Sequence, residues 1–243
     1  MTTRPLPASQ PSRSPLAAYL VHAYTAVGAV LAFIGTIAVV QNNPRRAFAM
    51  MFLATIVDAT DGALARLARV KAVLPGVDGA HLDDIVDYLT FVFLPMVLIE
   101  RTGGLPQQAG LLVIAVVLIT SVIGFSMQDA KTVDNFFTGF PSYWNIVVLY
   151  LYAAKTPPAF NAVLLLALSA LIFVRIGYIY PSRTTQFRRL TLALGALWAV
   201  EIAAIIWLLP AAPGWLLIVS LVFPVYYFVM SLLLHARRQV QST

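Results

Sequence analysis

Six carboxylate side chains are concentrated in one short stretch of an otherwise apolar chain. The sequence has 10 Asp and Glu residues, and residues 58–87 hold six of them: Asp58, Asp61, Asp78, Asp83, Asp84 and Asp87. Carboxylates in apolar surroundings are costly, and several together repel one another unless a cation lies between them. Because hard divalent cations prefer oxygen ligands, the stretch predicts a metal site.

The spacing of these residues predicts two helical faces that carry the chemistry. At about 100° per residue, two acids, two small residues and one base share the first face: Asp58, Asp61, Gly62, Ala65 and Arg66. One small residue and two acids share the second face: Gly79, Asp83 and Asp87. Two such faces can converge around divalent cations, and their small residues let a ligand approach the backbone. Asp78 and Asp84 fall outside the pattern and are interpreted as loop or supporting acids.

The complete pattern is Asp-x2-Asp-Gly-x2-Ala-Arg followed by Gly-x3-Asp-x3-Asp. Every position is filled, and the pattern resembles the signature of the CDP-alcohol phosphatidyltransferase family. Residues 67–78 separate its two halves, a spacer longer than the roughly eight residues of most of the family. This length resembles the bacterial branch that uses choline, as do residues 21–26 (VHAYTA) and 140–145 (FPSYWN).

The resemblance implies a reaction and the residues that perform it. The donor would be CDP-diacylglycerol, the acceptor an alcohol, and CMP the released product. Two divalent cations, Mg²⁺ or Mn²⁺, would be held by Asp58, Asp61, Asp83 and Asp87, and Asp87 would also be the general base. The implied donor-binding residues are Asp58, Gly62, Ala65, Arg66, Gly79, Asp83, His22 and Thr25. Homodimers are implied as well.

Choline is the expected acceptor, and proteins usually hold its quaternary ammonium over aromatic faces. The candidate contacts are Tyr143, Trp144, Asn145, Tyr24 and Tyr180. Tyr143 and Trp144 fit an aromatic belt at a membrane interface equally well.

The alternative acceptors are serine, glycerol phosphate and inositol phosphate. An anionic acceptor would need a basic pocket near Asp87, and the residues that could form one are Arg175, Arg183 and Lys131. Arg175 could equally extend to the membrane interface.

The composition places the chain among integral membrane proteins. Hydrophobic residues make up 60% and charged residues 11% of the 243 residues, and the mean hydropathy is +0.84. Soluble domains carry roughly 25% charged residues. The absence of Cys excludes disulfides, zinc–thiolate sites and thiol nucleophiles. A net charge of +6 is better explained by cytoplasmic basic residues near anionic lipids than by binding to nucleic acid.

The apolar runs predict an all-α bundle of about eight transmembrane helices, since a span needs about 20 residues. A Pro- and Ser-rich tail (1–15) is expected to be disordered, and residues 16–238 form the transmembrane domain. The expected spans are 16–40, 46–69, 82–100, 105–127, 141–154, 160–180, 190–209 and 215–235.

The alternative function of a cation transporter is disfavoured by the position of the acids. Transporters usually bind their ions near the middle of the membrane, between repeated halves. Here the acids are expected near one membrane face, and the sequence shows no internal repeat. Glu201 falls within the seventh span and has no assigned role.

The basic residues predict the orientation of this bundle. With the N-terminus inside, eleven Lys and Arg lie in cytoplasmic segments, four lie in outer segments, and Arg175 lies within a span. This bias favours cytoplasmic termini and a cytoplasmic acidic site. We therefore expect a multi-pass protein of the bacterial inner membrane whose soluble product leaves into the cytoplasm.

Overall fold

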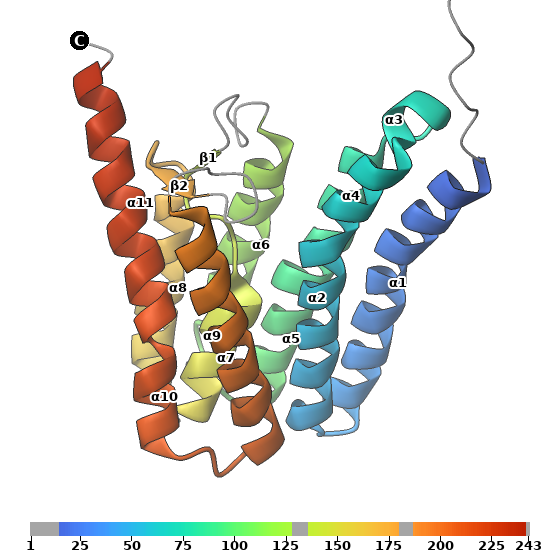
Figure 1. The fold of residues 1–243 in the computed structure, drawn as a ribbon. Coiled ribbons are helices and arrows are strands. Elements are labelled where there is room, and N and C mark those ends of the chain that lie inside the picture. Colours follow the sequence, from blue (N-terminus) through green and yellow to red (C-terminus); the bar gives the residue numbers. More distant parts are fainter. Residues whose placement is uncertain (1–14, 128–135, 180–186, 242–243) are drawn as a thin grey trace, which may run out of the picture.

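A computed structural model describes residues 15–127, 136–179 and 187–241, without the side chains of 136–138, 179 and 237–241. The expected tail (1–15) therefore lies almost entirely outside the described residues, as do the loop 128–135 and Tyr180. The described chain is a bundle of helices with one small two-stranded sheet (Figure 1).

The first two predicted spans are confirmed as helices. α1 is Pro15–Val40 and α2 is Pro44–Ala68, and α1 packs most extensively against α2. The turn between them follows from its sequence. The Asn43 side chain accepts the N–H of Arg46 at 3.0 Å, and Pro44 occupies the first turn, where its missing N–H costs no hydrogen bond.

The third predicted span is one helical rod in three parts. After the single turn α3 (Val70–Val73), α4 covers Gly79–Asp87, the π-helix η1 covers Tyr88–Phe93, and α5 covers Leu94–Arg101. The rod lies against α1 along its whole length.

Two glycines of α1 bring the rod close. A Cβ added at Gly28 would overlap Val86 Cγ1, and one added at Gly35 would lie 2.5 Å from Leu94 Cδ2. Because small residues let helices approach closely, this stripe of α1 sets the position of the rod.

The middle of the chain departs from the expected spans. α6 covers Gly110–Ser126, α7 covers Trp144–Ala153 and α8 covers Pro158–Leu171. With its 10 residues α7 is about 15 Å long, too short to cross a bilayer. The expected helix 160–180 is wrong beyond Leu171, because the chain turns there into a strand.

That strand forms the only sheet found in the described part of the chain. β1 (Phe136–Thr138) pairs antiparallel with β2 (Gly177–Ile179). Gly139 follows β1 with a φ of 81°, and its missing side chain lets the backbone pass the carbonyl of Ile172. A pairing between segments about 40 residues apart has no local signal, which is why the sequence pattern did not predict it.

The last two predicted spans are helical, and the second of them is divided into two helices. α9 covers Arg188–Leu208, α10 covers Gly214–Ser220 and α11 covers Val222–Gln241. Pro224 explains the break at Leu221, because a proline ring clashes with the carbonyl four residues earlier, here that of Ser220.

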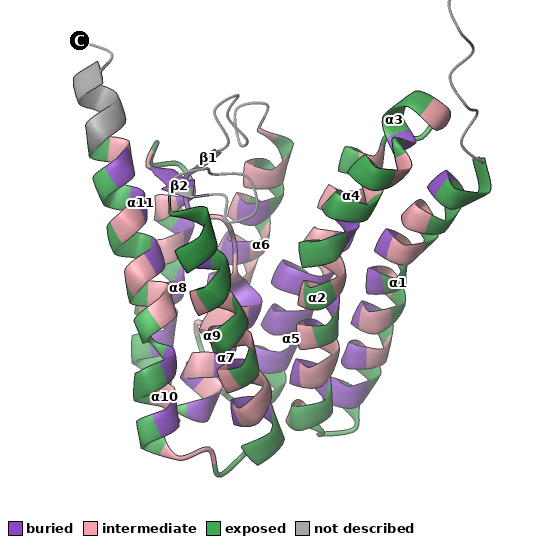
Figure 2. Ribbon diagram, in the orientation of Figure 1, coloured by how far each residue is buried: buried purple, intermediate pink, exposed green. Residues whose placement is uncertain are grey.

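The surface agrees with an all-α membrane protein. Among the described residues, four helices are long and apolar enough to cross a membrane: Pro15–Val40, Pro44–Ala68, Arg188–Leu208 and Gly214–Ala236. Large apolar side chains are exposed along them, Phe33 at 66% and Trp207 at 76% being examples. Figure 2 shows the buried residues gathered along inner helices such as α5, with exposed residues on the outer helices. A count of eight spans and the direction of the termini stay predictions.

One end of the bundle collects the segments that carry the acids. In Figure 1, α1 begins at the same end at which α11 ends, and α3 and the start of α4 lie there too. The acidic part of α2 and the acidic part of α4 therefore lie toward the same end.

We expect Gly28→Ala to destabilise the protein. The new Cβ would overlap Val86, whose β-branched side chain is stiff in a helix, and overpacking of this kind costs about 1–3 kcal/mol. Thermal unfolding in detergent measures the loss. Gly195→Ala is the matched control, since the nearest atom to its Cβ is at 3.4 Å. Equal stability of the two variants would contradict close packing at Gly28.

Candidate metal and donor site

Three of the predicted carboxylates converge between α2 and α4. Asp58, Asp83 and Asp87 each offer an oxygen, and these oxygens lie within 4.8 Å of one another. All three residues are half-buried. A divalent cation at about 2.0–2.6 Å from each ligand fits between oxygens at such separations, and an all-carboxylate donor set suits Mg²⁺ or Mn²⁺. The expected convergence of the two helical faces is present at these three acids.

The start of α4 is held by an acid outside the motif. Asp78 Oδ1 accepts the backbone N–H groups of Ala80 at 3.0 Å and His81 at 3.2 Å, and so caps the helix. These two hydrogen bonds lower the pKa of Asp78 below its usual value, and the one from His81 has the larger effect. The cap sets where α4 begins and therefore which turns carry Asp83 and Asp87.

Asp61 lies outside this group of three and is tied to α1 instead. Its Oδ2 accepts the hydroxyl of Thr25 at 2.7 Å, and the residue is only 7% exposed. At the preceding residue of each helix, the hydroxyls of Tyr24 and Thr60 share a second hydrogen bond of 2.8 Å between α1 and α2. Thr25 therefore meets one of the predicted acids directly, and α1 orients the acidic face of α2.

The predicted small residues are adjacent to two predicted donor contacts. A Cβ at Gly79 would lie 2.9 Å from Cε1 of His22, so the missing side chain leaves room for the imidazole. The Nε2 atom of His22 is buried and has no hydrogen-bond partner among the described residues. On α2, the Arg66 guanidinium lies beside Gly62, 3.4 Å from where a Cβ would be, and Ala65 is half-buried.

The predicted acceptor segment packs beside α2. Asn145 is 4% exposed and donates from Nδ2 to Thr55 Oγ1 at 3.1 Å, one turn before Asp58. Its Oδ1 is buried without a partner among the described residues. Trp144 is fully buried and donates to Ser121 Oγ at 2.8 Å, so its indole belongs to the packing of α6 against α7.

Tyr143 is the most accessible predicted aromatic residue of this segment. It is half-buried, and its ring centroid lies 6.5 Å from that of Tyr227 on α11. Tyr227 in turn stacks on Tyr178 of β2 at 6.3 Å. Sequence reasoning missed Tyr178, Tyr227 and Thr55, because only the folded chain brings α11, β2 and α2 to this segment.

Two further charged residues were singled out in the sequence, Arg175 and Glu201. Arg175 is exposed in the turn between α8 and β2, rather than inside a helix as expected. Glu201 is half-buried on α9, the helix whose Trp198 bonds to the Tyr150 hydroxyl. Tyr150 also donates to Ser220 and accepts from Trp198, so this polar group links α7 to α9 and α10.

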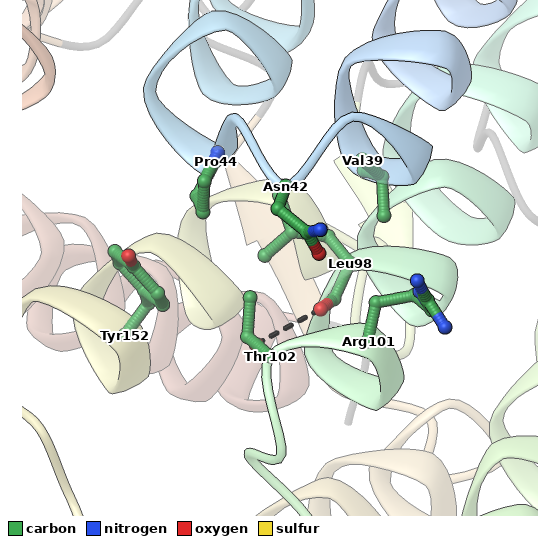
Figure 3. A pocket seen from close by; sticks show the side chains of 7 residues that line it. All are labelled: Val39, Asn42, Pro44, Leu98, Arg101, Thr102 and Tyr152. Carbon is green, nitrogen blue, oxygen red and sulfur yellow. Dashed lines mark hydrogen bonds between the residues drawn. The ribbon is translucent and has the colours of Figure 1, made fainter.

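A separate pocket of about 240 Å³ lies at the opposite end of the bundle. Figure 3 shows its lining side chains around the turn between α1 and α2: Val39, Asn42, Pro44, Leu98, Arg101, Thr102 and Tyr152. The pocket contains none of the predicted site residues. It therefore does not bear on the chemistry of the acids.

Curated relatives of high similarity carry one name. The chain is 39% identical over 194 residues to a phosphatidylcholine synthase of Pseudomonas aeruginosa, a match that covers 80% of this chain and 82% of that protein. It is 44% identical over 168 residues to one of Legionella pneumophila, covering 69% and 66%. A third, from Rhizobium johnstonii, is 31% identical over 217 residues, covering 89% and 90%. No protein-family model matches the chain.

We expect Thr25→Val to destabilise the protein by about 1.5–3 kcal/mol, because a buried carboxylate loses its hydroxyl donor. Thr36→Val is the matched control on the same helix, since that hydroxyl bonds only to the Ala32 carbonyl of its own helix. Unfolding in detergent compares the two. Equal losses would contradict a special role of the bond to Asp61.

Proposed function

Because the chain belongs to the phosphatidylcholine synthase family, we propose that it transfers the phosphatidyl group of CDP-diacylglycerol to choline and releases CMP. The observation that carries the proposal is the convergence of Asp58, Asp83 and Asp87 between two helices. Carboxylates this close together favour a bound cation, which offsets their repulsion. The same positive charge can neutralise the diphosphate of the donor during transfer.

We assign the metal ligands from the donor set. Asp58, Asp83 and Asp87 hold one divalent cation, and Asp61 contributes to a second through Oδ1, its other oxygen being bonded to Thr25. Bound Mg²⁺ or Mn²⁺ would neutralise the diphosphate and align the attacking and leaving oxygens. The donor set accepts both ions, so the proposal covers either.

Asp87 is the proposed general base. It lies one turn further along α4 than Asp83, and its carboxylate takes the proton of the choline hydroxyl. The alkoxide oxygen then forms a bond to the phosphorus of the phosphatidyl group, and the bond from that phosphorus to the CMP oxygen breaks. The leaving CMP carries the electron pair of the broken bond.

The donor is proposed to lie between α1, α2 and the start of α4. His22, Thr25, Gly62, Ala65, Arg66 and Gly79 are its predicted contacts beside Asp58 and Asp83. The unpartnered Nε2 of His22 supports this placement, since a buried polar atom without a hydrogen bond is costly until a ligand supplies one. Arg66 is exposed beside Gly62 and can pair with a phosphate oxygen.

Choline is proposed to bind near the start of α7. Tyr143 offers an aromatic face there, and Asn145 offers a buried amide oxygen without a partner among the described residues. Trp144 would contribute through packing, since it is fully buried. Tyr24 on α1 stays a proposed contact, as does Tyr180, which lies outside the described residues.

The cellular setting is proposed from the basic residues and the relatives. We place the protein in a bacterial inner membrane as a homodimer, with both termini and the acids toward the cytoplasm. CMP would then leave into the cytoplasm, and the lipid product would diffuse within the bilayer.

Purified protein supplied with CDP-diacylglycerol, Mn²⁺ and labelled choline should form labelled phosphatidylcholine and one CMP per lipid. Serine, glycerol 3-phosphate and inositol phosphate serve as competing acceptors. Incorporation of one of these without choline would contradict the proposed acceptor. Cation uptake into vesicles without CMP release would instead favour a transporter.

Asp87→Asn should lower kcat by about 10²–10⁴-fold and largely spare donor binding, because the base is lost while the side chain keeps its size. Single-turnover CMP release and binding of labelled donor measure the two effects. Asp78→Asn is the control, since its amide oxygen still caps α4. Near-normal turnover of Asp87→Asn would exclude it as the base.

Asp58→Ala should weaken Mn²⁺ and nucleotide binding together, because one ligand of the convergent trio is removed. Electron paramagnetic resonance of free Mn²⁺ measures the metal affinity, and equilibrium binding of labelled donor measures the nucleotide affinity. Unchanged Mn²⁺ affinity would rule out Asp58 as a ligand.

A further inference from the structure

The rod that carries Asp83 and Asp87 changes its hydrogen-bonding pattern directly after Asp87. The N–H of Tyr88 bonds to the carbonyl of Asp84, four residues earlier, as in an α-helix. The N–H of Leu94 bonds to the carbonyl of Leu89, five residues earlier. One additional residue is therefore accommodated within η1, between the acidic turns and α5.

Pro95 accounts for this change. It has no N–H, and in a regular α-helix its ring would clash with the carbonyl four residues earlier, that of Phe91. A π-type turn relieves such a clash by widening the helix at that point. Pro95 is in the first turn of α5, immediately after η1.

The additional residue changes which side chains share a face. Without it, at about 100° per residue, Asp83, Asp87, Leu94 and Leu98 would fall within an arc of about 60°. Leu94 and Leu98 are 0% exposed and belong to the apolar core. A regular helix would therefore turn the acids and these core leucines toward the same side.

With the additional residue, everything after η1 is rotated by about 100° relative to α4. Contacts with α1 agree with this rotation. Val86 and Leu94 would be about 80° apart in a regular helix, but the rotation reduces this to about 20°. Both indeed meet one stripe of α1, Val86 at Gly28 and Leu94 at Gly35. The acids are left on a different side, where Asp83 and Asp87 meet Asp58 of α2.

We propose that Pro95 is a positioning residue for the reaction: through η1 it turns Asp83 and Asp87 toward Asp58 while α5 keeps its apolar face in the core. The inference rests on the proposed roles of these acids as ligands and base. Thr90 supports the same geometry from within η1, since its hydroxyl donates to the carbonyl of Val86 at 3.0 Å.

Pro95→Ala restores the missing N–H and lets the rod become a regular α-helix. We expect Mn²⁺ affinity to fall at least about tenfold and kcat to fall by about 10²-fold, since small misplacements of reacting groups have effects of that size. Because the chain has no Cys, spin labels at Leu64→Cys and Ile85→Cys, both exposed, report the movement of α4 relative to α2 without activity. Pro158→Ala, at the start of α8, is the control, and we expect it to leave all three readouts unchanged.

A second variant separates positioning from general damage. Deleting Leu89 in the Pro95→Ala background removes the additional residue, so a regular helix would again turn the acids toward α2 and the leucines toward the core. We expect this double variant to regain Mn²⁺ affinity, the wild-type spin-label distance and part of kcat, even if Pro95→Ala alone does not fold.

Unchanged Mn²⁺ affinity and label distance in Pro95→Ala would overturn the proposal, and so would a double variant that does not regain them. Failure of the proposed function gives a different result. In that case wild-type protein itself would not bind Mn²⁺ at these acids, or Asp87→Asn would retain turnover.

Discussion

The mutual repulsion of carboxylates in an apolar bundle is the constraint on which the site depends. Asp58, Asp83 and Asp87 present oxygens within 4.8 Å of one another, half-buried between two helices. At such distances the like charges oppose folding unless a cation is shared, and the desolvation of each acid adds to the cost. The arrangement of the acids therefore favours a bound cation, and the proposed chemistry uses the charge of that cation.

Helix α1 is the element against which both acidic helices are placed. Its Thr25 bonds to Asp61 of α2, and its Gly28 and Gly35 bring the rod α4–η1–α5 into close contact. Both sets of contacts come from one helix, so α1 helps to set the relative position of α2 and α4. These contacts hold the two acidic helices beside one another despite the like charges of their carboxylates.

The acidic centre was predictable because helical periodicity is local, and positions 58, 61, 83 and 87 show their shared faces in the sequence. The contact between Thr25 and Asp61, and the burial of Trp144, depend on how separate helices meet, so spacing could not reveal them. The β1–β2 pair joins distant segments for the same reason. Pro95 and Pro224 were readable signals, since proline in a helix interior requires a local change. Whether that change is a π turn, as at Pro95, or a break, as at Leu221, depends on the packing around it.

The central claim is tested most directly by a crystal structure of the protein soaked with Mn²⁺. An anomalous difference map from data collected at the manganese absorption edge locates the bound ion. The account predicts an anomalous peak bounded by the carboxylates of Asp58, Asp83 and Asp87. Manganese found only elsewhere on the protein, with the three side chains turned away from one another, would contradict it.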